Sequence, residues 1–154
     1  MPCSQQINHF LTAIFQNILS VEEGFVHSAL KDRRVTITEI HILDQIGPEG
    51  SRRMGDVAES LGVTLPTLTA SAERLCRKGL AVKARDGVDR RVVNISLTDA
   101  GREVCRLHSE FHQRLVARVT QGLEPSDLPA FTRLLEQVNG FFEELSAEGG
   151  ALLS

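Results

Sequence analysis

The segment spanning residues 89–101 constrains the fold of this chain more than any other part of the sequence. Arg90 and Arg91 lie near its start, and residues 92–97 follow them as a short run with β-branched side chains. Residues 80–85 form a similar run just before it, and the residues between the two runs include an Asp-Gly turn signal. The two runs therefore predict a β-hairpin whose tip carries arginines.

A hairpin of this kind is typical of a DNA-binding wing. Arginine side chains at the tip of a narrow ribbon can reach the minor groove of a duplex while a preceding helix occupies the adjacent major groove. We expect Asp89 to hold one of the guanidinium groups in place through a bidentate contact. The alternative is a hairpin whose charged side chains are simply solvated.

The residues before the hairpin have the spacing of a helix-turn-helix. A short helix is predicted over 54–60, Gly62 suits the turn, and Thr64 begins a second helix that runs to Lys78. Pro66 is tolerated in the first turn of this second helix. Its polar face carries short hydrogen-bonding side chains and one cation that suit base edges and phosphates, namely Thr64, Thr67, Thr69, Ser71 and Arg74.

Apolar residues recur at helical spacing through most of the remaining chain. This pattern predicts a long helix over residues 7–25, a second helix over 38–47, and two C-terminal helices over 98–122 and 126–145. Thr36 and Glu39 form a predicted capping box before the second of these helices. The fold class expected is therefore mainly α, with a two-stranded β wing and long terminal helices.

Composition limits the classes of function. Residues 52–91 hold nine Lys or Arg and five Asp or Glu, a net +4 within a chain of net charge −3, so the other residues carry −7. This local excess of positive charge suits contact with phosphates.

The sequence lacks a membrane-length apolar stretch and a signal peptide, which predicts a cytoplasmic protein with no membrane partner.

The reactive side chains do not form a catalytic motif. The cysteines at 3, 76 and 105 are widely spaced and contain no Cys-x-x-Cys pair, which favours reduced thiols. A His-Glu-x-x-His sequence, a glycine-rich phosphate loop and a nucleophile elbow are all absent from the sequence. We therefore do not expect an enzyme.

The pattern Asp89-x-Arg91-x5-Leu97-Thr98-x-x-Gly101, together with the predicted order of helices, resembles the MarR family of winged-helix regulators. The resemblance implies one domain over 1–154, with a winged-helix core at 36–98 and helical dimerisation regions at 1–35 and 99–154. It also implies a homodimer in which each subunit reads one half of a palindromic operator in double-stranded DNA.

Four segments, residues 10–15, 63–65, 89–93 and 106–112, are similar to the subgroup of this family that represses fatty-acid synthesis. The resemblance adds Leu65 to the DNA-reading residues. It also implies an effector, a long-chain acyl group on acyl carrier protein, whose binding strengthens operator affinity. Apolar side chains that could line its pocket are Phe10, Ile14, Phe15, Ile18 and Phe111, although such stripes are commonly plain core.

The histidines support an alternative effector. His108 and His112 lie four residues apart on one helix, and Glu23 and His41 could complete a tetrahedral zinc site. This set is similar to the zinc-responsive branch of the same family. Two further alternatives remain open: the histidines are satisfied by internal hydrogen bonds, or the protein responds to another small ligand. Zinc is the one cofactor that the sequence suggests.

Overall fold

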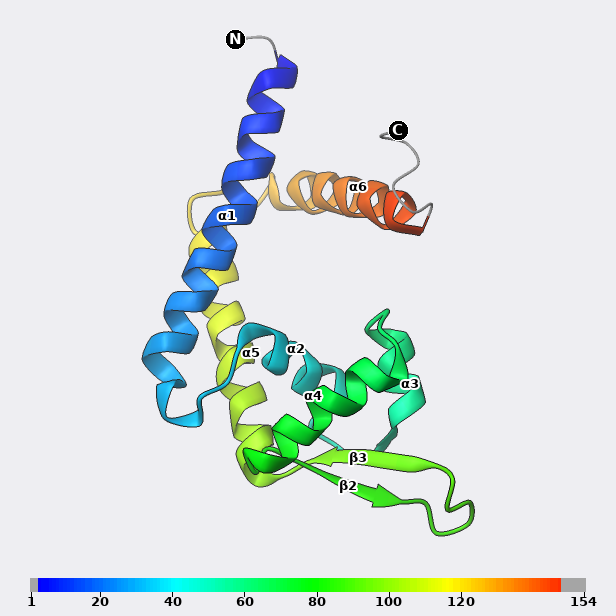
Figure 1. The fold of residues 1–154 in the computed structure, drawn as a ribbon. Coiled ribbons are helices and arrows are strands. Elements are labelled where there is room, and N and C mark those ends of the chain that lie inside the picture. Colours follow the sequence, from blue (N-terminus) through cyan, green and yellow to red (C-terminus); the bar gives the residue numbers. More distant parts are fainter. Residues whose placement is uncertain (1–2, 148–154) are drawn as a thin grey trace. The chain divides into compact units, whose positions relative to one another are not determined.

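The structure is a computed structural model that describes residues 3–147. These residues form two compact units, which meet inside one helix between Phe111 and His112. The helices are α1 (Cys3–Ala29), η1 (Lys31–Arg33), α2 (Ile37–Ile46), α3 (Met54–Ser60), α4 (Leu65–Arg77), α5 (Asp99–Thr120) and α6 (Leu128–Ala147), and the strands are β1 (Arg52–Arg53), β2 (Ala81–Arg85) and β3 (Val93–Leu97) (Figure 1). The mainly α winged-helix class predicted from the sequence is confirmed.

Side chains at the helix starts explain where the helices begin. At α2, the Thr36 hydroxyl accepts a hydrogen bond from the backbone N–H of Glu39, while the Glu39 carboxylate accepts one from the N–H of Thr36, so the predicted capping box is present. At α4, the Thr64 hydroxyl accepts from the N–H of Thr67, with Pro66 in the first turn. Gly79, at a φ of 70°, follows the end of α4 in the left-handed region that glycine adopts without strain.

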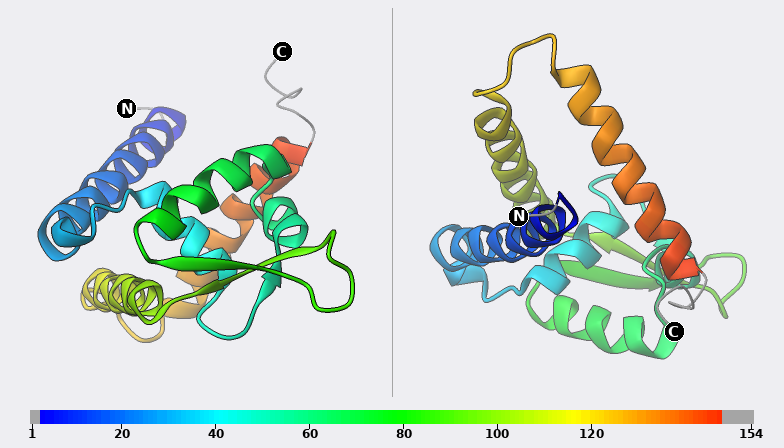
Figure 2. Two further views of the ribbon diagram at one scale, coloured as in Figure 1. Left: turned by 60° about the horizontal axis from the view of Figure 1, so that its bottom comes forward. Right: turned by 90° about the horizontal axis from the view of Figure 1, so that it is seen from above.

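The sheet has three strands in the order β1-β3-β2, all antiparallel. The predicted hairpin is confirmed as β2 and β3, and its loop extends beyond the neighbouring helices (Figure 2). The strand β1, which was not predicted, pairs Arg52 with Ile95 and Arg53 with Asn94. A strand of two residues is too short to show an alternating pattern, so only its distant partner reveals it.

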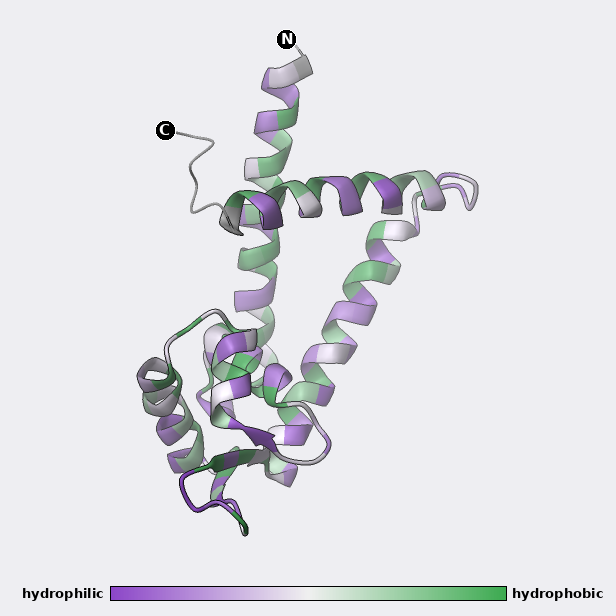
Figure 3. Ribbon diagram, turned by 90° about the vertical axis from the view of Figure 1, so that its right-hand side faces the viewer, coloured by the Kyte–Doolittle hydropathy of each residue, from purple (hydrophilic) through white to green (hydrophobic). Residues whose placement is uncertain are grey.

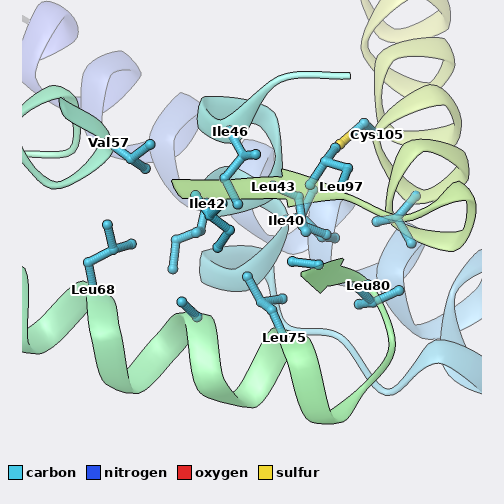
Figure 4. Close-up of a cluster of buried hydrophobic side chains, with 14 of the residues drawn as sticks. Ile40, Ile42, Leu43, Ile46, Val57, Leu68, Leu75, Leu80, Leu97 and Cys105 are labelled. Atoms are coloured by element: carbon cyan, nitrogen blue, oxygen red, sulfur yellow. The ribbon is translucent and has the colours of Figure 1, made fainter. Parts of the chain in front are cut away.

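The core of the first unit lies between α2, α3, α4 and the sheet. Ile40, Leu43 and Leu75 are fully buried there, together with other aliphatic side chains (Figure 4). Ile95 of β3 is fully buried as well. Leu68 and Leu75 come from the inner face of α4, so burial of that face leaves its opposite face to solvent. The core thereby sets which side of α4 is available for binding.

The helix α1 has a different pattern of burial. Its C-terminal part reaches the core through Phe25 and Val26, whereas many apolar residues in its N-terminal part are exposed in the single chain. Apolar residues recur along this helix in Figure 3. In the second unit, α6 also exposes apolar side chains, among them Leu134, Val138 and Phe141. Within residues 3–147, no helix combines the length and the apolar character needed to cross a membrane.

Candidate DNA-binding surface and effector sites

The exposed face of α4 carries several of the predicted DNA-reading residues. Thr64 and Thr67 are exposed at its start, and their hydroxyls lie 2.9 Å apart. Leu65 is 48% exposed beside them. The Thr69 hydroxyl donates to the backbone carbonyl of Leu65 at 2.8 Å, so part of its hydrogen-bonding capacity is used inside the helix.

The structure corrects the prediction for Ser71 and changes the surroundings of Arg74. Ser71 is 7% exposed on the inner face of α4, so it is not available to contact a base. It accepts a hydrogen bond at 2.8 Å from the guanidinium of Arg74, whose Nε lies 3.9 Å from Glu39. Ser71 follows the threonines in the sequence, but on the helix it lies between Leu68 and Leu75, within about 60° of each, and so on the buried side.

The loop of the hairpin carries the predicted wing residues at its tip. Arg90 and Arg91 are both exposed, and the side chain of Arg91 is 93% exposed. The Asp89 Oδ1 atom accepts hydrogen bonds from the backbone N–H of Arg91 at 3.0 Å and from its Nε at 3.4 Å. Asp89 thus holds Arg91 through one carboxylate oxygen rather than through the predicted bidentate contact.

A hollow of about 320 Å³ separates the wing from the starts of α3 and α4. Three cations, Arg53, Lys83 and Arg91, line it together with Leu65 and Thr69 from the exposed face of α4. Arg53 and Lys83 were not among the predicted DNA-binding residues. Lys83 was already within the predicted hairpin, but Arg53 is placed by the unpredicted pairing of β1 with β3.

The carboxylate of Glu39 connects the start of α2 to the end of α4. Lys78 donates to both of its oxygens, at 2.8 and 2.6 Å, and also to the backbone carbonyl of Arg34 at 2.7 Å. Burial raises the pKa of Glu39, but hydrogen bonds from Lys78 and Thr36 outweigh this effect and hold the pKa below its ordinary value of 4.5. The recognition helix is therefore anchored by a partly buried ion pair as well as by its apolar face.

A cluster of histidine and carboxylate side chains joins α1, α2 and the first half of α5. Glu22 Oε1 lies 2.8 Å from His108 Nε2 and 3.3 Å from His41 Nε2, and Asp44 Oδ2 lies 2.8 Å from His108 Nδ1. Burial raises the pKa of Glu22, but its hydrogen bonds to both histidines and their charges lower it overall below 4.5. Each ring nitrogen of His108 therefore faces a carboxylate oxygen, Nε2 that of Glu22 and Nδ1 that of Asp44.

This cluster corrects the predicted metal ligands at one position. The carboxylate beside His41 and His108 belongs to Glu22, which is 4% exposed, whereas the predicted Glu23 is exposed. One residue turns a helical side chain by about 100° and so takes it off the shared face. The three-residue step from Glu22 to Phe25, which packs against the core, is the sequence signal that identifies Glu22. The fourth predicted ligand, His112, is the first residue of the second unit.

Three side chains of the cluster are placed so that they could hold a metal ion together. Ligand atoms of Glu22, His41 and His108 lie within 4.8 Å of one another. In a tetrahedral site with metal–ligand distances of about 2.0–2.2 Å, adjacent ligand atoms lie about 3.3–3.6 Å apart. The 3.3 Å separation between Glu22 and His41 agrees with this, whereas the 2.8 Å separation between Glu22 and His108 is that of a hydrogen bond. Asp44 on the other nitrogen of His108 is in the position of an outer carboxylate that orients a metal-bound imidazole.

The predicted effector-pocket residues have two different environments. Phe111 stacks on Phe25 with ring centroids 4.6 Å apart, next to His108. The four predicted residues on α1 are exposed, at 59% for Phe10, 53% for Ile14, 65% for Phe15 and 44% for Ile18. A pocket that includes them would need further atoms to cover α1.

The chain is similar to proteins of one family. A model of the MarR family matches residues 35–92. The crystal structure of Streptococcus pneumoniae FabT in complex with DNA is 36% identical, covers 92% of this chain and 99% of that chain, and has a TM-score of 0.83.

Two further relatives are named as regulators of transcription. The repressor MdtR of Bacillus subtilis is 31% identical over 59% of this chain, and the chain spans about half of that relative's length, 56%. The regulator AdcR of Streptococcus pneumoniae is 24% identical over 89% of this chain and 95% of its own. MdtR and AdcR are thus regulators rather than enzymes, and FabT is a protein that binds DNA.

Proposed function

Because the chain belongs to the MarR family of DNA-binding transcriptional regulators, we propose that it acts as a homodimeric repressor of fatty-acid synthesis genes that responds to long-chain acyl groups on acyl carrier protein. The observation that carries this proposal is the similarity to FabT, which extends over nearly the whole of both chains. The segments that resemble fatty-acid-synthesis repressors lie in α1, α4, the wing and α5, so the resemblance includes both the reader and the helices around Phe111.

The exposed apolar residues of α1 support the dimer and the acyl effector together. Side chains such as Phe10 and Phe15 are more exposed than is favourable for large apolar groups in water, and a second copy of the chain would cover them. A long acyl chain between subunits would bury further apolar surface. Such a ligand changes DNA affinity if it binds more tightly to the dimer whose recognition helices match successive turns of the duplex.

The proposal is tested with purified protein and labelled duplexes. Fluorescence anisotropy compares a fragment from upstream of the host's fatty-acid synthesis genes with a random duplex of equal length, with palmitoyl-acyl carrier protein or the unacylated carrier added. We expect selective binding to the upstream fragment and at least about fivefold tighter binding with the acylated carrier, since couplings of 1–3 kcal/mol are typical. Equal effects of the two carriers would contradict the lipid effector but leave DNA binding intact.

A second candidate function is zinc-responsive DNA binding, which the geometry of the Glu22, His41 and His108 cluster favours. Zinc would be held by the Glu22 carboxylate and the two imidazoles, with Asp44 orienting His108. We expect about one zinc per subunit in protein purified without chelator, and loss of that zinc in His41→Ala. His27→Ala, which removes an exposed histidine of α1 outside the cluster, is the matched control. Equal zinc content in the two variants would exclude this site.

A further inference from the structure

We propose that Asp86 is a positioning residue for DNA binding, because its carboxylate holds the wing loop in the conformation that presents Arg90 and Arg91. Asp86 follows directly after the end of β2 at Arg85, so it lies where the chain leaves the sheet. It was not among the residues predicted to bind DNA. The inference rests on DNA binding by the wing and does not depend on the identity of the effector.

The hydrogen bonds of Asp86 span the loop. Its Oδ1 atom accepts from the backbone N–H of Val88 at 2.9 Å and of Asp89 at 3.1 Å. Its Oδ2 atom lies 3.3 Å from the side-chain amide nitrogen of Asn94, which donates to it. Asn94 belongs to β3, the central strand of the sheet. Asp86 therefore ties the tip of the loop to the most firmly held strand.

The position of Asp86 is passed on to Arg91 through Asp89. The N–H of Asp86 donates to the carbonyl of Val92, and the N–H of Val92 donates to the carbonyl of Asp89, both at 2.9 Å. Asp89 in turn accepts from the backbone and the guanidinium of Arg91. Val88 is 99% exposed, so packing contributes little at the tip and these hydrogen bonds must order the loop.

Because Asp86 is negatively charged, an effect on loop order can be told apart from an effect of its charge on DNA binding. Hydrogen bonds from the N–H groups of Asp89 and Val88 lower the pKa of Asp86, with smaller contributions from Asn94 and the charge of Arg53, so the group is ionised at neutral pH. An anion near the phosphates repels DNA. Removing it should strengthen binding if charge alone matters, and weaken binding if loop order matters.

The test compares Asp86→Ala with Asp86→Asn on a genomic fragment that the wild-type protein selects. Alanine removes both the charge and the acceptors, whereas asparagine keeps an acceptor for the two N–H groups and can exchange donor and acceptor with Asn94. We expect Asp86→Ala to bind about tenfold more weakly, which corresponds to about 1.4 kcal/mol, and Asp86→Asn to bind within about twofold of wild type. Asp56→Ala, which removes an exposed carboxylate from the hollow beside the wing, should bind as well as wild type or more tightly.

Two results overturn the proposal: Asp86→Ala binding as tightly as wild type, or Asp86→Asn binding as weakly as Asp86→Ala. Amide hydrogen exchange provides a measurement that needs no DNA. The N–H groups of Val88 and Asp89 should exchange several-fold more slowly in wild type and Asp86→Asn than in Asp86→Ala, and equal rates also contradict the proposal. If wild-type protein selects no fragment, DNA binding itself fails, and the exchange rates still decide the function of Asp86 in the loop.

Discussion

At the scale of single residues, Arg91 shows how much a side chain depends on its support. It is almost fully exposed, yet Asp89 restricts both its backbone and its guanidinium. Such restriction lowers the entropy that the side chain must lose when it contacts DNA. A flexible arginine at the same place would carry the same charge but would lose more conformational entropy on contacting DNA.

We predict that Arg91→Ala weakens binding to a selected genomic fragment by about 1–3 kcal/mol, with the fold intact. If Arg91 contacts a phosphate as well, the slope of log affinity against log salt should fall by about 0.9. The measurement is a gel-shift or anisotropy titration at several salt concentrations. Arg33→Ala, which removes an exposed cation from η1, is the control, and equal affinities of the two variants would argue against a function for Arg91 in DNA binding.

Glu39 gives a prediction for pH dependence. Because the pKa of Glu39 in the folded protein lies below 4.5, its contribution to stability is complete above that value and is lost as the pH falls through the folded pKa. Chemical unfolding followed from pH 7 to pH 3 should therefore show a smaller loss of stability on acidification in Glu39→Gln than in wild type. Glu39→Gln should also be destabilised at pH 7 by about 1–3 kcal/mol, because the amide leaves Lys78 without a charged partner. Parallel pH profiles of the two proteins would contradict this assignment.

At the scale of elements, close packing explains why the wing motif ends in a glycine, Gly101. A Cβ atom at this position in α5 would lie 2.0 Å from the backbone carbonyl oxygen of Leu80, a distance that no side-chain rearrangement can relieve. The Thr98 hydroxyl donates to the carbonyl of Gly79 at 2.7 Å and accepts from the N–H of Gly101 at 3.1 Å. The start of α5 therefore lies directly against the turn that leads into β2, which fixes the hairpin to the helix.

We predict that Gly101→Ala lowers the free energy of unfolding by about 3 kcal/mol or more, measured in urea, although alanine ordinarily favours a helix by about 1 kcal/mol. Gly24→Ala is the matched control, because a Cβ atom at residue 24 of α1 meets no atom within 4 Å. That variant should be as stable as wild type or more stable. A Gly101→Ala protein of wild-type stability would show that α5 does not lie against Leu80 in solution.

The local elements were predictable because their signals are contained in adjacent residues. The capping box at Thr36, the threonine cap of α4 and the spacing around Gly62 depend on groups a few residues apart. In contrast, β1 exists because Arg52 and Arg53 meet the distant Ile95 and Asn94, and no pattern within two residues can indicate such a pairing. The burial of Ser71 and the choice of Glu22 over Glu23 likewise depend on which side of a helix the core covers.

At the scale of the whole molecule, the exposed apolar residues of α1 predict association of two copies. We predict that Ile14→Glu, which places a charge on this face, raises the dimer dissociation constant at least about 100-fold, because burying a carboxylate in an apolar interface costs several kcal/mol. Sedimentation or light scattering over a concentration series provides the measurement. Asn17→Glu, an exposed polar position on the same helix, should leave the dimer intact, and a wild-type protein that is monomeric at micromolar concentration would contradict the prediction.

Residue types and spacing were sufficient to indicate the mainly α winged-helix class, the wing with its exposed arginines and the threonine-capped recognition helix, because each depends on local hydrogen bonds and on helical or strand periodicity. Tertiary contacts were needed to join Glu22 with His108, Glu39 with Lys78 and Asp86 with Asn94. The first two pairs come from elements far apart in the chain, and the third depends on the register of the hairpin. A hydrogen bond requires atoms within about 3 Å of each other, and only the packed fold brings these groups to that distance.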